Sequence, residues 1–275
     1  MPLFTVTYAP SVEGHAGMQV YGNVDHVGFT YDDLETASKN LQSAYGIEAR
    51  IEAIPLLGEE QPSAWILIAP NVLPAILKAV NSNLDDLACE LSQMPLDEHA
   101  VMRGQLKRKR ARHNNCIADV GRDADFDARP AKGTIVSFST LPLVSHMRNV
   151  IGDMFGDKAL QLFAETNKYY DLATCGIGLH GDGERRLVVG MRCHTGNQDS
   201  DRELNTPIQF QWFKHHAPVG ERMFFDLKPG DLYAMSEKAV GTDWKRSTIA
   251  TLRHATGSSI YVKTNAELLK KRKHE

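Results

Sequence analysis

The chain has 275 residues, of which 42% are hydrophobic and 24% are charged, and its formal net charge at pH 7 is −3. These values are ordinary for a globular protein of one large or two small domains, and the small net charge argues against a general nucleic-acid or membrane binder. No apolar run approaches the roughly 20 residues that span a bilayer, and no signal peptide is expected. The four cysteines have no C-x-x-C spacing and indicate reduced thiols, so we expect a cytoplasmic protein.

The first part of the chain predicts strands and helices in mixed order. The predicted elements are strands at residues 4–8 and 64–69 and helices at residues 32–45 and 74–80. The first helix has Thr30 or Asp32 as its candidate N-cap and closes at Gly46. Pro74 suits the first turn of the second helix, where its missing N–H costs nothing.

The middle of the chain predicts helices and one loop. Residues 84–110 favour a helix that is interrupted at Pro95, and residues 143–167 are mostly helical in pattern. Residues 113–133 are rich in Gly, Asp and Pro and therefore predict a loop.

The last part predicts short strands separated by turns. Apolar runs of strand length occur at residues 187–191, 208–213 and 232–235, and a Pro-Gly-Asp turn at 229–231 precedes the last of them. Such a series is typical of an all-β barrel or sandwich.

His180 and Asp182 are the most informative pair in the sequence. On an extended strand, residues i and i+2 point to the same face, so this imidazole and carboxylate can reach one point together. One more imidazole, which we assign to His254, completes a 2-His-1-carboxylate triad that leaves three positions of an octahedral Fe(II) open. Alternatives for the third ligand are His194, His215 and His216. An ordinary polar pair at 180 and 182, with His254 as a satisfied core residue, would need no metal.

A cation near this triad could hold the far carboxylate of a keto-acid cosubstrate that chelates the same iron. Lys263 is the first candidate, because it lies nine residues after His254. Arg253 is the second, although it adjoins His254 and should point the other way on a strand. An ammonium that faces a carboxylate in a partly dry pocket gains a charge-assisted hydrogen bond. Lys263 could also be a solvated strand residue.

The motif Asn167-x-Tyr169, followed by His180-x-Asp182, the segment PGDLYAMS at 229–236 and a late His and Lys, resembles the Fe(II)/2-oxoglutarate-dependent oxygenases. The resemblance covers roughly residues 133–265 and is closest to the AlkB-like branch. The spacing of the late His and Lys is more similar to the prolyl-hydroxylase branch.

The resemblance implies an α+β protein with a double-stranded β-helix (jelly-roll) core and oxidation of a C–H bond. His180, Asp182 and His254 would bind iron, Asn167 and Tyr169 would hydrogen-bond 2-oxoglutarate, and Lys263 would pair with its distal carboxylate. The expected organisation is a mixed α/β part at 1–130, which forms a buttress and substrate lid, and the catalytic domain at 131–275.

The expected substrate is a small phosphorylated or nucleobase-containing molecule such as a nucleotide or nucleoside, whereas nucleic acid is less favoured. The basic run from Lys107 to Arg112 predicts a phosphate clamp, because clustered cations bind phosphate, although a solvated helix face would look the same. Amide side chains after the run suit an adenine edge. The candidate substrate-binding residues are Arg108, Arg110, His113, Asn114, Asn115, Glu184 and Arg185. A structural ion pair is the plain alternative for the last two.

Three alternative functions remain open at this stage. Halogenases of the same fold carry Gly or Ala in place of the metal carboxylate, so Asp182 argues against halogenation unless it is not the native residue. An AlkB-type nucleic-acid demethylase would share the same motif. A jelly-roll without productive iron could simply bind a nucleotide or RNA, but the intact ligand set argues against a dead site.

Overall fold

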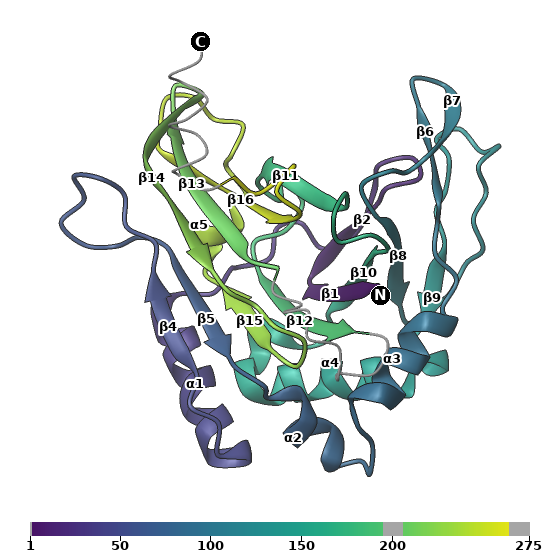
Figure 1. Ribbon diagram of the computed structural model, residues 1–275, viewed down its shortest axis with the longest axis horizontal. Coiled ribbons are helices and arrows are strands. Elements are labelled where there is room, and N and C mark those ends of the chain that lie inside the picture. The colour runs from purple at the N-terminus through teal and green to yellow at the C-terminus, as the bar shows by residue number, and fades with distance from the viewer. Residues whose placement is uncertain (1, 195–205, 264–275) are drawn as a thin grey trace.

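The computed structural model describes residues 2–194 and 206–263. Strands dominate the architecture, which is α+β with two main sheets, two hairpins and a layer of helices (Figure 1).

The large sheet has eight strands and is antiparallel except for the pair β8–β9. In order across the sheet, the strands are β4 (Arg50–Ala53), β5 (Trp65–Ala69), β15 (Leu232–Met235), β12 (Val188–His194), β1 (Leu3–Ala9), β10 (Phe163–Tyr169), β8 (His113–Ala118) and β9 (Ile135–Ser137). The N-terminal strand β1 therefore lies in the interior of the sheet, between two strands of the C-terminal half.

The smaller sheet has four antiparallel strands, and two hairpins stand apart from both sheets. The smaller sheet runs in the order β11 (Gly176–His180), β16 (Thr251–Gly257), β13 (Ile208–Lys214) and β14 (Ala217–Phe225). The hairpins are β2 (Ser11–Gly14) with β3 (Gln19–Gly22) and β6 (His99–Met102) with β7 (Gln105–Arg108).

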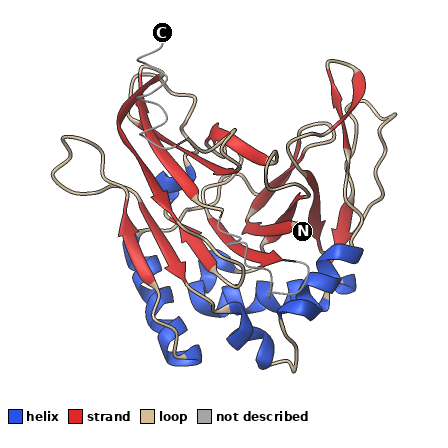
Figure 2. Ribbon diagram, in the orientation of Figure 1, coloured by secondary structure: helices blue, strands red, loops and turns tan. Residues whose placement is uncertain are grey.

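Of the five α-helices in the described part of the chain, four gather on one side of the molecule, against the large sheet (Figure 2). The helices are α1 (Tyr31–Tyr45), α2 (Leu73–Lys78), α3 (Leu84–Gln93), α4 (Pro142–Phe155) and the separate short α5 (Glu237–Val240). Short 3₁₀ turns at Phe138–Thr140 and Gly156–Ala159 flank α4. Phe4, Val6 and Tyr8 of β1 belong to the core that these helices cover. A second core, which includes Ile68 and Phe210, packs the large sheet against the smaller one.

Local chemistry explains the boundaries of α1. The Thr30 side chain accepts from the backbone N–H of Asp33, and the Asp33 carboxylate accepts from the Thr30 backbone at 2.7 Å, which is a capping box. Gly46 ends the helix at φ 68°, a left-handed conformation that glycine adopts without strain. The predicted helix and both of its predicted ends are thus confirmed.

The predictions for the middle of the chain were partly wrong. After Pro95 the chain forms the β6–β7 hairpin in place of a helix, with Arg103 and Gly104 at positive φ in its turn, as a two-residue hairpin loop requires. The predicted loop begins with the buried strand β8, and the predicted helix at 143–167 ends at Phe155, before β10. Strands β8 and β10 lack the alternation of apolar and polar residues that is typical of a strand, because several of their polar side chains are hydrogen-bonded inside the protein.

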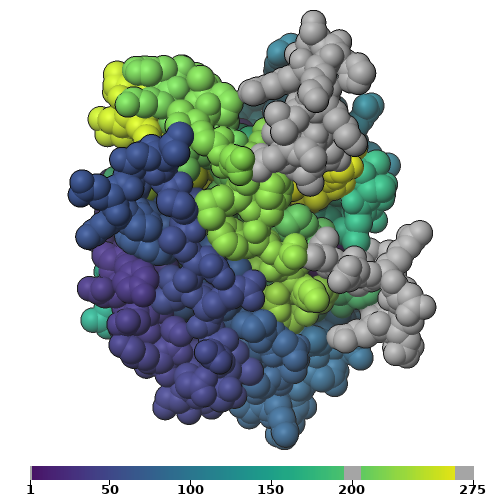
Figure 3. Space-filling model, turned by 60° about the vertical axis from the view of Figure 1, so that its left-hand side comes forward, coloured from purple at the N-terminus to yellow at the C-terminus, as the bar shows by residue number. Residues whose placement is uncertain are grey.

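The strands on either side of residue 130 share one sheet. The large sheet takes β1, β4, β5 and β8 from the part before residue 130 and its other four strands from the part after it. Figure 3 shows the purple and blue N-terminal segments and the green C-terminal strands as one continuous surface. The division predicted at residue 130 therefore follows no boundary of the large sheet.

Among the helices within 2–194 and 206–263, none combines the length and the apolar character needed to cross a bilayer.

Candidate metal centre

The inner face of the large sheet carries a row of polar side chains. Thr5 of β1 lies opposite Asn167 of β10 and Arg192 of β12, and Thr7 lies opposite Glu165. Directly opposed residues of paired strands point to the same face, so these side chains share the face that is turned away from the helices.

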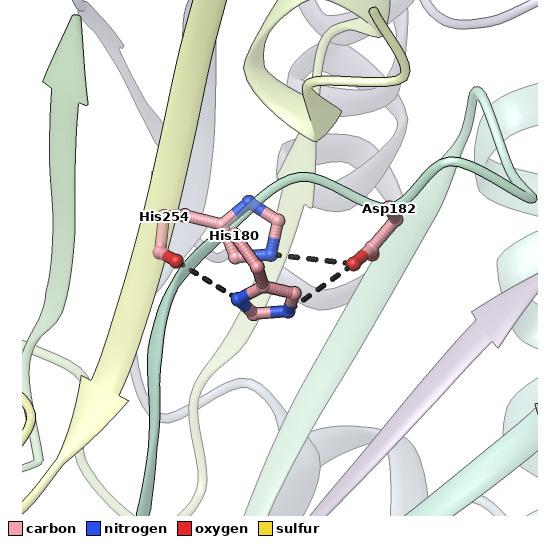
Figure 4. A group of neighbouring side chains, drawn as sticks. All are labelled: His180, Asp182 and His254. Carbon is pink, nitrogen blue, oxygen red and sulfur yellow. Dashed lines mark hydrogen bonds and ion pairs between the residues drawn. The ribbon is translucent and has the colours of Figure 1, made fainter. Parts of the chain in front are cut away.

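The three predicted ligands converge on the smaller sheet (Figure 4). His180 ends β11 and pairs in register with His254 of β16, and Asp182 follows in the next loop. Asp182 Oδ1 lies 3.3 Å from His180 Nε2 and 3.7 Å from His254 Nε2. The potential ligand atoms of the three residues all lie within 4.8 Å of one another, so the group can hold a metal ion.

Backbone carbonyls fix the tautomer of His180. Its Nδ1 lies 2.8 Å from the carbonyl oxygen of Gly178 and 3.0 Å from that of His254, and only a protonated Nδ1 can donate to a carbonyl. In the neutral ring, Nε2 then carries a lone pair that faces Asp182. This is the usual state of a metal-binding histidine.

Gly181 allows the H-x-D segment to pass close to a second loop. A Cβ at this position would lie 2.1 Å from the carbonyl oxygen of Gly241 and 2.7 Å from Cβ of Trp244. The Asp182 N–H donates to the carbonyl of Val240 at 3.1 Å in the same region. The middle residue of the motif must therefore be glycine for Asp182 to reach its place.

Arg185 contacts the other oxygen of Asp182. Its Nε lies 3.5 Å from Asp182 Oδ2, and its Nη2 lies 2.9 Å from Glu165 Oε2 and 2.7 Å from Glu184 Oε1. Arg185 is only 5% exposed, so three carboxylates surround a buried guanidinium. Asp182 is thus held with Oδ1 toward the imidazoles and Oδ2 toward Arg185.

These charges shift the pKa values of the ligands. Burial alone would raise the pKa of Asp182, but Arg185, His254 and His180 outweigh burial and hold this pKa well below its usual range. Burial lowers the pKa of His254 to about 4, and the nearby His180 adds to the effect. Burial would also lower the pKa of His180, but the hydrogen bond and charge of Asp182 prevail and raise it. At neutral pH the carboxylate is ionised and His254 is neutral, as metal ligation requires.

A cavity of about 610 Å³ lies in front of the three residues and is lined by both sheets. Its wall includes four further residues predicted from the sequence: Asn167, Tyr169, Glu184 and Arg185. Asn167 and Tyr169 lie on β10 and share a face, as an extended segment predicts and a helix end would not. The volume falls in the range of roughly 300–1,000 Å³ found for small-molecule sites.

Both cations predicted for the cosubstrate lie away from the cavity. Lys263 is exposed near the end of the described chain. The Arg253 guanidinium lies 4.0 Å from the centre of the Phe213 ring, on the opposite face of β16 from His254. Neither residue lines the cavity wall.

Most of the basic run also lies outside the cavity. Arg108 and Arg110 are exposed, and Arg108 pairs with Glu98 at 3.2 Å. Lys109 is buried, and burial lowers its pKa to about 8. Arg112 is the member of the run whose side chain lines the cavity wall.

The residues predicted to contact a base are instead part of the sheet. The His113 ring lies 4.5 Å from that of Tyr170, and the Asn115 amide donates to the carbonyl of Pro95. Asn114 accepts a hydrogen bond from Lys109 Nζ at 2.5 Å. None of the three lines the cavity, and β8 is buried along its whole length.

The alternative histidines do not join the group of ligand atoms that the described residues form. His215 and His216 form the exposed turn between β13 and β14 with φ values of 50° and 63°. His194 is buried at the far end of β12, opposite Leu3.

Arg192 is a buried residue that was not predicted from the sequence. This residue is 1% exposed and donates to Thr206 Oγ1 at 2.5 Å and to Thr256 Oγ1 at 2.9 Å, while its Nε has no partner. No ion pair among the described residues neutralises it. The available signal was a charged residue inside the apolar run 187–193.

The fold and site define a β-rich α+β protein with a candidate metal centre of two imidazoles and one carboxylate. The chain is similar to an uncharacterized protein of Acanthamoeba polyphaga mimivirus, with 36% identity over 268 residues that cover 94% of this chain and 97% of the viral protein. At this identity and coverage, the chain belongs to the same family as the viral protein. No family model matches the chain.

Proposed function

We propose that the protein is an Fe(II)/2-oxoglutarate-dependent oxygenase with a jelly-roll core, which hydroxylates a C–H bond of a small nucleotide-like substrate. The observation that carries this proposal is the convergence of His180, Asp182 and His254 at the wall of a cavity of ligand size. Two neutral imidazoles and one carboxylate are the donor set of the facial triad that Fe(II) oxygenases use.

The residues present fit iron and a keto-acid cosubstrate. The carboxylate is ionised, His180 directs its Nε2 toward Asp182 because its Nδ1 contacts backbone carbonyls, and the three residues line the cavity. Iron and 2-oxoglutarate, when bound, would supply O₂ activation coupled to decarboxylation of 2-oxoglutarate to succinate and CO₂. The protein itself orients the ligands and excludes water from the cavity floor.

We assign the distal carboxylate of the cosubstrate to Arg192 in place of Lys263. Arg192 does not line the cavity wall itself, but its hydrogen-bond partner Thr256 and its strand neighbour Thr5 do. A buried guanidinium without a counter-charge is costly, and a bound carboxylate would remove that cost. Thr5 Oγ1 is also buried without a partner, lines the cavity and lies on the strand position next to Arg192. Asn167 and Tyr169 line the same part of the wall and would hydrogen-bond the cosubstrate, as the resemblance implies.

Halogenation is disfavoured by the position of Asp182. Its Oδ1 is in contact range of both imidazoles, so the carboxylate fills the position that a halide would need. Hydroxylation is therefore the reaction that the ligand set supports.

A spectroscopic titration tests the proposed function. Anaerobic protein with Fe(II) and 2-oxoglutarate should develop a weak visible charge-transfer band, and admission of O₂ should yield succinate. His180→Ala should abolish both signals. His216→Asn, in an exposed turn, should retain them. The absence of band and succinate in iron-loaded wild-type protein would refute the oxygenase.

The substrate can be sought by mass shift. Nucleotides and nucleosides are incubated with the iron-loaded protein, 2-oxoglutarate and O₂, and a substrate gains one oxygen atom in stoichiometry with succinate. Oxygen gain in oligonucleotides alone would favour a nucleic-acid enzyme over the small-molecule assignment.

A further inference from the structure

We propose that Arg112 binds the anionic group, a phosphate or a carboxylate, of the molecule that is oxidised in the cavity. This role rests on the proposed function, because it concerns the substrate end of the same site. Arg112 lies one residue before β8 and lines the cavity together with Asn167 and the metal ligands.

The guanidinium of Arg112 has only neutral partners among the described residues. Its Nε donates to Asn167 Oδ1 at 2.5 Å, and its Nη2 lies 3.4 Å from His15 Nε2. The same ring nitrogen lies 3.1 Å from Glu165 Oε1, and this shorter contact to a carboxylate favours a proton on Nε2. A ring nitrogen that donates to Glu165 cannot accept from Arg112. Among the described residues, the terminal nitrogens of the Arg112 guanidinium are thus left without a hydrogen-bond acceptor.

Glu165 is a carboxylate near Arg112 that already accepts hydrogen bonds from other side chains. Glu165 accepts from Arg185 at 2.9 Å, from His15 at 3.1 Å and from Asn167 Nδ2 at 3.2 Å. Among the described residues, Glu165 forms no ion pair with Arg112. A ligand carboxylate or phosphate can therefore form the bidentate pair that the protein does not supply.

The other two arginines of the site are committed elsewhere. Arg185 is enclosed by three carboxylates. Arg192 lies on β12, two strands away from Asn167 on β10. Neighbouring strands are about 4.8 Å apart, so these two positions are separated by roughly 10 Å. A cosubstrate carboxylate that is held at Arg192 leaves Arg112 available for a second anion.

Apolar side chains near the cavity mouth indicate the rest of the ligand. Met18, Val20 and Val24 line the cavity and are 62%, 43% and 45% exposed, although side chains of this kind are normally covered. Such a wall favours an aromatic or aliphatic surface on the ligand. The substrate class is a small molecule with one anionic group and one apolar or aromatic body.

Paired ligands that differ only in charge test this assignment by binding, without turnover. Calorimetry is carried out without O₂, with and without Mn(II) and 2-oxoglutarate, on two series. One series pairs nucleoside monophosphates with their nucleosides, and the other pairs hydrophobic amino acids with their amides. The series in which the anion binds better identifies phosphate or carboxylate as the group.

We expect wild-type protein to prefer the anionic member of at least one pair by roughly ten- to a hundredfold, the strength of a charge-assisted bond. Arg112→Gln should bind both members alike, and Arg112→Lys should restore part of the preference. Arg50→Gln removes the same charge from an exposed strand edge and should keep the full preference.

Several results would overturn the role of Arg112. A structural role would weaken both members of a pair equally in Arg112→Gln. An unchanged preference in that variant, or no preference for an anion in wild-type protein, would also reject it. A loss of 2-oxoglutarate affinity in Arg112→Gln would make Arg112 a cosubstrate residue. By contrast, an intact anion preference in a protein that never forms succinate would retain Arg112 and reject only the oxygenase.

Discussion

Glu165 is a buried carboxylate whose charge contributes to stability. Burial alone would raise its pKa, but His15, Arg185 and Arg112 outweigh burial and lower the pKa below its ordinary value of 4.5. The unfolded chain therefore takes up the proton first, so the stability that Glu165 supplies is full above pH 4.5 and is lost as the pH falls below it.

Glu165→Gln should consequently lower the free energy of unfolding at neutral pH by about 3 kcal/mol, because Arg185 loses a buried partner. Urea unfolding from neutral pH down through 4.5 should show a flatter acid dependence for the variant than for wild-type protein. Parallel curves for the two proteins would show that the pKa of Glu165 is the same in the folded and unfolded states.

Arg185 positions Asp182, so its loss should weaken metal binding although it touches no metal. Without the guanidinium, Asp182 Oδ2 is released and the carboxylate can rotate away from the imidazoles. We expect Arg185→Gln to lower Mn(II) affinity about ten- to a hundredfold, measured by calorimetry. The matched control is Arg186→Gln, since Arg186 pairs with Glu237 away from the metal ligands. Equal effects of both variants would assign Arg185 a general electrostatic role.

Single residues of the site could be predicted where their spacing along the chain determines their position. His180 and Asp182 are two residues apart, the spacing that brings side chains to one face of an extended segment, although Asp182 lies in the loop after β11. Arg112 and Arg192 approach the site only through the register of β8, β10, β1 and β12, which residue spacing does not reveal. Lys263 was predicted from its spacing of nine residues after His254, but β16 ends at Gly257 and Lys263 is exposed.

At the scale of an element, the loop after β11 depends on a close passage beside the loop after α5. Gly181→Ala should place its Cβ within 2.1 Å of the Gly241 carbonyl, so one backbone must move. We expect a loss of about 1–3 kcal/mol of stability and weaker Mn(II) binding. Gly183→Ala is the matched control, because its Cβ would have Trp244 Nε1 at 3.8 Å as the nearest atom. The unfolding temperature and the Mn(II) affinity of the two variants should differ clearly. Similar values would mean that the two loops can move apart without loss of stability.

Elements with a local signal were predicted well, and those fixed by tertiary contacts were not. The capping box and Gly46 mark α1 in the sequence itself. In the β6–β7 hairpin, β7 is exposed along its whole length and has no apolar alternation, so only the Arg103-Gly104 turn signals the hairpin. In β8, Asn114 is tolerated because Lys109 satisfies it, a partner that no pattern within the strand predicts.

On the scale of the whole molecule, the two sheets carry different parts of the site. The smaller sheet and its adjoining loop hold the three metal ligands, and the large sheet carries Arg192 and Arg112's partner Asn167. A metal ion alone would stabilise the smaller sheet. A cosubstrate that also contacts Arg192 would link the smaller sheet to the large one. Ligand binding should therefore stabilise the fold in two distinguishable steps.

The thermal stability of the protein should report these two steps. At a ligand concentration of 100 times Kd, binding adds about 2.7 kcal/mol, which for a chain of this size raises Tm by roughly 5–10 °C. Mn(II) should give one increment and 2-oxoglutarate, added without O₂, a second. Arg192→Met removes a buried charge that has no counter-ion within residues 2–194 and 206–263, so the ligand-free variant should be at least as stable as wild type. It should keep the Mn(II) increment and lose that of 2-oxoglutarate, whereas Lys263→Gln should keep both. A 2-oxoglutarate increment that survives in Arg192→Met but disappears in Lys263→Gln would return the cosubstrate carboxylate to Lys263.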